Sequence, residues 1–67
     1  MIADLDAWRA AGVLISEYGE DAELIAVQRA DALLDVDEVD GYRFFEVVVK
    51  AITELRRTKR KEGERVN

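Results

Sequence analysis

The segment from Tyr42 to Leu55, YRFFEVVVKAITEL, is the densest apolar stretch of this 67-residue chain. From Phe45 onward its apolar residues recur at intervals of three, four and three, which keeps them on one face of an α-helix. That line is Phe45, Val48, Ile52 and Leu55. A second line of Tyr42, Val49 and Thr53 lies on another flank. A helix that is apolar on more than one flank is usually central in its fold or covered by a partner.

A β-strand is the competing interpretation of this segment, because aromatic and β-branched residues are common in strands. A half-buried strand needs alternating apolar and polar residues, but Phe44 and Phe45 are adjacent and three valines follow one another at 47–49. The helical spacing also continues to Leu55. The pattern therefore favours a helix.

Residues that typically cap or end helices divide the chain into three predicted helices at residues 4–18, 21–35 and 38–61. Asp4 is a candidate N-cap, and Gly19 fits the left-handed stop of the first helix. Asp37 is a candidate N-cap for the third helix, and a start at Asp40 is the alternative. We expect an all-α fold, a small three-helix antiparallel bundle that homodimerisation could complete. The single domain would span 1–62, with a frayed tail at 63–67.

The first two predicted helices also have apolar faces. Leu5, Trp8, Gly12 and Ile15, joined by Ala11 and Leu14, form one face of the first. Gly12 would allow close approach of Phe44 or Phe45 there. The second helix carries a main line rich in alanine and a second line of Leu24, Val27 and Leu34. The second and third predicted helices each carry two apolar lines, which is more apolar surface than one short neighbouring helix can cover. We therefore expect apolar surface to remain for another chain.

The order of residues resembles a group of short alphaproteobacterial helical proteins classed as a domain of unknown function. The resemblance covers about Asp4 to Leu55 and implies no activity, cofactor or substrate. It is carried by Trp8 with Ala11, Tyr18-Gly19-Glu20-Asp21-Ala22, Arg29-Ala30-Asp31, Asp40-Gly41, an aromatic at Phe44 or Phe45, and Ala51-Ile52 with Leu55.

Composition excludes several chemistries. The chain has no Cys and no His, which removes disulfides, ordinary zinc sites and the usual parts of nucleophilic catalysis. An acidic segment at 35–41, DVDEVDG, resembles a calcium loop, but its glycine is one position out of register. We therefore predict no enzyme activity, cofactor or metal.

The charge is unevenly distributed, with a net −9 over residues 1–55 and +4 over residues 56–67. The candidate phosphate contacts at the basic end are Arg56, Arg57, Lys59, Arg60 and Lys61. The acidic body would repel a nucleic acid, so a nucleic-acid-associated regulator is the alternative function rather than the main one. The acidic N-terminus lacks the pattern of a signal peptide, and no segment is apolar enough to span a membrane. We expect a bacterial cytoplasmic protein.

These observations predict a small non-enzymatic protein-interaction or regulatory module that acts through an apolar helical face. Its partner would be itself, as a homodimer, or another protein. The candidate interface residues are Tyr42, Phe45, Val48, Val49 and Ile52.

Overall fold

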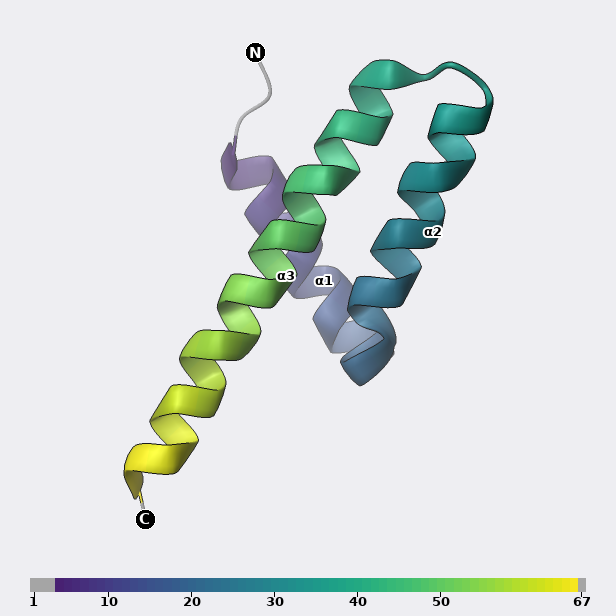
Figure 1. Cartoon of the computed structure of the whole chain (residues 1–67). Helices are drawn as coiled ribbons and strands as arrows, with labels where there is room; N and C mark the ends of the chain where they lie inside the picture. Colours follow the sequence, from purple (N-terminus) through teal and green to yellow (C-terminus); the bar gives the residue numbers. More distant parts are fainter. Residues whose placement is uncertain (1–3, 67) are drawn as a thin grey trace.

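The computed structural model of the protein describes the backbone of residues 4–66 and the side chains of residues 5–57. This part of the chain is all-α, as predicted: α1 (Asp4–Tyr18), a 3-10 turn η1 (Gly19–Asp21), α2 (Ala22–Asp35) and α3 (Val39–Val66) (Figure 1). The helix α3 continues to Val66, beyond the end predicted at residue 61. The side chains of the tail predicted to fray, 63–67, lie outside the described residues.

The helices α2 and α3 run antiparallel side by side, and α1 crosses behind α3 (Figure 1). The largest contact is between α2 and α3, and the smallest contact between two α-helices is that of α1 with α2. The molecule measures 47 × 24 × 15 Å, and its radius of gyration is 13.0 Å. A globular domain of this length would have a radius of gyration of about 11 Å, so the shape is elongated.

The core is built mainly from the smallest apolar side chain. Among residues 5–57, nine hydrophobic residues are buried and six of these are alanines. Val48 and Ile52 are the only large side chains in this range that are fully buried. The buried alanines are Ala7, Ala11, Ala22, Ala26, Ala30 and Ala51. Because alanine has only a methyl group, the helices can approach closely, but each alanine removes little apolar area from water.

The face of α1 that packs on the other helices is only partly the predicted one. Ala11 and Leu14 enter the core as predicted, together with Ala7, whereas Leu5 and Trp8 stay 59% and 40% exposed. A Cβ atom added at Gly12 would meet no heavy atom within 4 Å, so the predicted approach of Phe44 or Phe45 to this glycine is wrong. The line of small residues, rather than the line with the aromatic ring, faces the other helices.

The two turns end the helices in different ways. Gly19 ends α1 with a φ of 57°, which confirms the predicted left-handed stop. After α2, the N–H of Asp37 donates to Leu34 O at 3.0 Å, and the N–H of Glu38 donates to Leu33 O at 2.8 Å. This pair of bonds is a Schellman motif, and Asp37 holds its left-handed position with a φ of 61°. Asp37 therefore ends α2 and is not the N-cap of α3, which the sequence had suggested.

We predict that Gly12→Ala stabilises the protein by about 1 kcal/mol, because the new methyl group meets open space and alanine is the better helix former. Urea unfolding followed by circular dichroism measures the change. Gly19→Ala is the matched control and should destabilise by about 1–2 kcal/mol, because its φ of 57° is unfavourable for alanine. Equal effects of the two substitutions would contradict the assigned helix and turn.

Asp37→Gly should also stabilise the fold, by about 0.5–1 kcal/mol, because glycine adopts the left-handed conformation without a Cβ penalty. The same unfolding experiment measures it. Asp37→Ala is expected to destabilise instead, since alanine tolerates this conformation less well than aspartate does. A loss of stability in the glycine variant would show that the aspartate side chain has a role in this turn.

Candidate protein-interaction face

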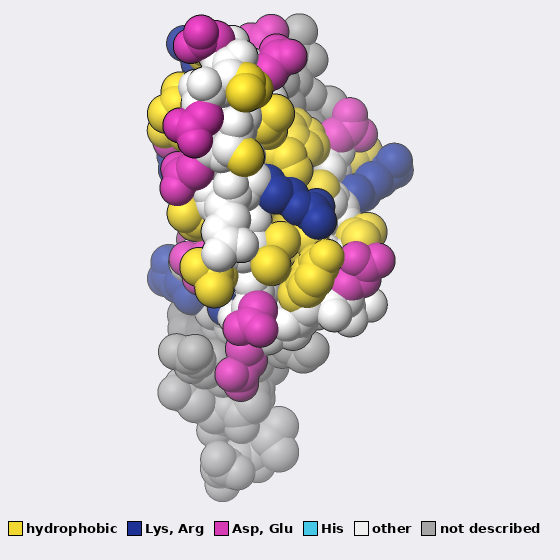
Figure 2. All heavy atoms as spheres, turned by 90° about the vertical axis from the view of Figure 1, so that its right-hand side faces the viewer, with side chains coloured by type: hydrophobic (Ala, Val, Ile, Leu, Met, Phe, Trp, Pro, Cys, Tyr) yellow, Lys and Arg dark blue, Asp and Glu magenta, His cyan; other side chains and the backbone are white. Residues whose placement is uncertain are grey.

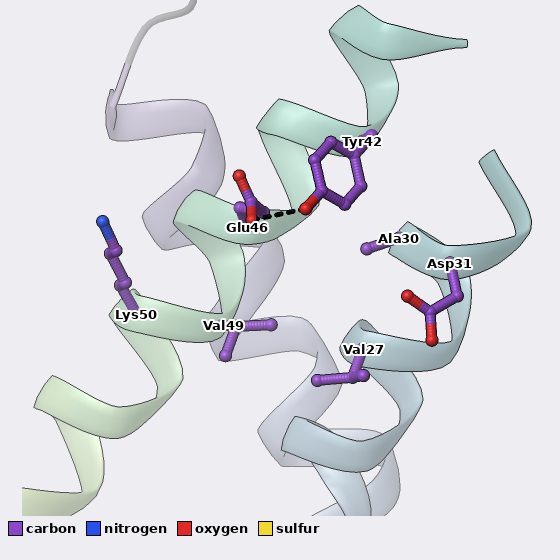
Figure 3. Close-up of a pocket in the computed structure, with 7 residues that line it drawn as sticks. All are labelled: Val27, Ala30, Asp31, Tyr42, Glu46, Val49 and Lys50. Atoms are coloured by element: carbon purple, nitrogen blue, oxygen red, sulfur yellow. Dashed lines mark hydrogen bonds between the residues drawn. The ribbon is translucent and has the colours of Figure 1, made fainter. Parts of the chain in front are cut away.

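A shallow groove of about 260 Å³ lies between α2 and α3. Val27 from α2 and Val49 from α3 point toward each other across it, and Tyr42 lies near one end (Figure 3). The lining residues are Val27, Ala30, Asp31, Tyr42, Glu46, Val49 and Lys50. The groove is thus apolar in the middle and has charged side chains of both signs around it.

Beside this groove, α2 presents an exposed apolar line. Leu24, Val27 and Leu34 are 55%, 40% and 45% exposed, and they form the second line expected from the spacing of the sequence. Figure 2 shows apolar side chains on this side of the molecule, with acidic and basic groups between and around them. We call the surface made by Leu24, Val27, Leu34, Tyr42 and Val49 the α2/α3 face.

The predicted interface residues separate into two groups. Tyr42 and Val49 belong to the α2/α3 face and are half-buried. Val48 and Ile52 are fully buried in the chain's own core, so their assignment to a partner interface is wrong. Phe45 packs against that core, with its ring edge-on to Phe44 at a centroid distance of 5.6 Å. The line from Phe45 to Leu55 is the one that α1 and α2 cover.

A hydrogen bond fixes the aromatic ring on this face. The Tyr42 hydroxyl donates to a Glu46 carboxylate oxygen at 2.8 Å, one helical turn further along α3 (Figure 3). This bond raises the pKa of Tyr42 above its usual 10.0, and the charge of Glu46, partial burial and the charge of Asp31 act in the same direction. The ring is therefore held in a neutral, oriented form at physiological pH.

The two described arginines of the basic end, Arg56 and Arg57, already form hydrogen bonds or ion pairs within the chain. Arg56 donates to Gly19 O at 2.6 Å and lies 3.7 Å from Glu23, which ties α3 to the turn between α1 and α2. Arg57 pairs with Glu54 at 3.3 Å. Lys59, Arg60 and Lys61, the other predicted phosphate contacts, lie outside the described side chains. Arg56 would have to leave its partners to bind a phosphate.

The acidic segment forms a tight turn instead of a calcium loop. Only residues 36–38 lie between α2 and α3, whereas an EF-hand loop has twelve residues. Counted from Asp35, Glu46 occupies position 12, where an EF-hand loop has its last ligand. Here Glu46 lies within α3 and accepts the bond from Tyr42. Among the described residues, no group of three or more acidic side chains is placed to hold a metal ion.

No known protein family, curated protein or solved structure matches this chain. Within the residues described, none of the helices combines the length and the apolar character needed to cross a membrane. The assignment of a role therefore depends on the surface itself. What that surface offers is an apolar two-helix strip with a charged rim, which suits contact with another polypeptide.

Replacing Glu46 should lower the pKa of Tyr42 toward 10.0, with a smaller change for Glu46→Gln, which keeps an acceptor, than for Glu46→Ala. Titration of the Tyr42 ring by NMR, assigned with Tyr42→Phe, measures this. Because the folded pKa is raised, the bond stabilises the fold fully below about pH 10 and loses its effect as the pH rises through the folded pKa. An unchanged titration in Glu46→Ala would contradict the bond.

Proposed function

We propose that this protein is a small non-enzymatic interaction module that binds a second copy of itself through the α2/α3 face. The observation that carries the proposal is the distribution of apolar side chains. The buried core is mostly alanine, while nine larger hydrophobic residues among those described are at least 38% exposed. A fold that leaves its larger apolar groups in water gains stability when another chain covers them.

The surface area supports the same proposal. The accessible surface is 5209 Å², whereas a compact monomer of 7.6 kDa would expose about 4,300 Å². The elongated helix α3 contributes to this excess. A stable dimer typically buries about 800 Å² of each chain, and an elongated chain with exposed apolar residues has surface available for such a contact.

The α2/α3 face suits this contact better than the exposed side chains of α1. Leu5, Trp8 and Val13 lie on one outward side of a single helix, and they share it with the exposed Arg9. The α2/α3 face spans two antiparallel helices with a groove between them, and side chains of a facing helix can enter such a groove. Two copies joined there would place four helices around a shared apolar centre and so complete the bundle.

The absence of enzyme activity is part of the proposal. The groove is shallow, and neither Cys nor His occurs in the chain. The pKa of Tyr42 in the groove is raised, which moves it further from neutral pH. A group that stays neutral and hydrogen-bonded serves as a contact residue rather than as a general acid or base.

Val49→Glu should convert the dimer into a monomer, because it puts a charge in the middle of the apolar face. Light scattering over a wide concentration range should give twice 7.6 kDa for the native chain and 7.6 kDa for the variant. Val27→Glu, at a more exposed position, should have the same effect with less risk to the fold. Circular dichroism checks that both variants stay helical.

Val13→Glu is the matched control, since Val13 is 55% exposed on α1 and lies outside the α2/α3 face. This variant should remain a dimer. A native chain that is monomeric at every concentration would refute the proposal. A dimer that survives Val49→Glu and Val27→Glu but is lost in Val13→Glu would move the interface to α1.

A further inference from the structure

The two helices of the α2/α3 face differ in charge on their outer flanks. On α3, the exposed residues Arg43, Lys50 and Arg57 recur every seven positions along one side of the helix, which they share with Glu46 and Glu54. Glu46 accepts the bond from Tyr42, and Glu54 pairs with Arg57. The only cation of α2 is Arg29, whose side chain donates to the Tyr18 hydroxyl of α1 at 3.4 Å. The exposed residues Asp31 and Asp35 give the outer flank of α2 a negative charge.

Asp31 and Lys50 lie on opposite sides of the groove (Figure 3). Neither side chain makes a hydrogen bond or an ion pair within the described part of the chain. Glu46, the other charged residue of the rim, is already held by Tyr42. The face therefore offers one positive group on its α3 side and one negative group on its α2 side, both available to a partner.

Two copies can meet at this face in two ways that preserve twofold symmetry. In the first, the twofold axis lies in the interface at right angles to the helices, so that α2 faces the partner's α2 and α3 faces the partner's α3. The acidic flank of α2 would then meet itself, and like charges across an interface are unfavourable. In the second, the twofold axis lies in the interface parallel to the helices. Each α3 then lies over the partner's α2 and runs antiparallel to it.

We propose that the dimer uses the axis along the helices, so that Lys50 of each copy pairs with Asp31 of the other. This inference rests on the proposed self-association and adds its orientation. Both apolar lines are then covered at once, since Tyr42 and Val49 face the partner's exposed line on α2. Each such pair occurs twice in the dimer because the interface is isologous. Arg43 lies on the same flank and reinforces the attraction to Asp35.

A charge-swap experiment tests this orientation. Lys50→Glu and Asp31→Lys should each weaken the homodimer by about tenfold or more at low salt, because two attractive pairs become repulsive. An equal mixture of the two variants should form a heterodimer about as stable as the native dimer, because both of its pairs are attractive. Native mass spectrometry with one isotope-labelled variant separates the heterodimer from the homodimers, and added salt should reduce the preference.

Arg9→Glu and Glu17→Lys on α1 are the matched controls, since they make the same charge changes away from the α2/α3 face. Their mixture should contain homodimers and heterodimers in statistical proportions. If the native chain is a dimer but Lys50→Glu and Asp31→Lys also mix in statistical proportions, the proposed orientation is wrong and self-association still holds. Preferential pairing of Lys50→Glu with Glu46→Lys, in place of Asp31→Lys, would assign the contact to two α3 helices. A monomeric native chain would refute the proposed function itself.

Discussion

Close packing of alanines against the two large buried residues of α3 determines most features of this structure. Val48 and Ile52 are fully buried, and α1 and α2 surround them with a line of small side chains. Helices that meet through alanine lie near one another and leave little space in the core. There is then no room inside for the larger residues, so Trp8 and Leu24 remain at the surface. The interaction face is a direct consequence of this packing.

The connections support that packing with few residues. Gly19 and Asp37 both adopt left-handed backbone conformations, and each lets the chain reverse direction immediately after a helix. Arg56 then ties α3 back to the first of these turns through Gly19 O. The short α2–α3 turn keeps these two helices antiparallel, which places the groove and its charged rim between them. The turns thus determine the geometry of the proposed interface.

The charges of the surface act on partner choice more than on stability. Exposed ion pairs such as Arg57 with Glu54 contribute little to folding. A pair of opposite charges on the two sides of an apolar groove is different, because it selects one orientation of the partner. In the proposed dimer, the apolar groups provide the attraction and the charges of Lys50 and Asp31 fix the orientation. The proposed dimer therefore gives the acidic flank of α2 a role that its composition alone would not indicate.

The sequence by itself determined that this chain is helical, because the spacing of apolar residues follows the helical period and does not alternate. It also located Gly19 as a stop and identified the second apolar line on α2, since both depend on neighbours along the chain. The tertiary structure decided which of two apolar lines on α3 is covered, and it placed Val48 and Ile52 in the core. It also turned the alanine line of α1 inward and assigned Asp37 to the end of α2. These choices depend on how closely distant helices approach, and sequence spacing contains no information on that distance.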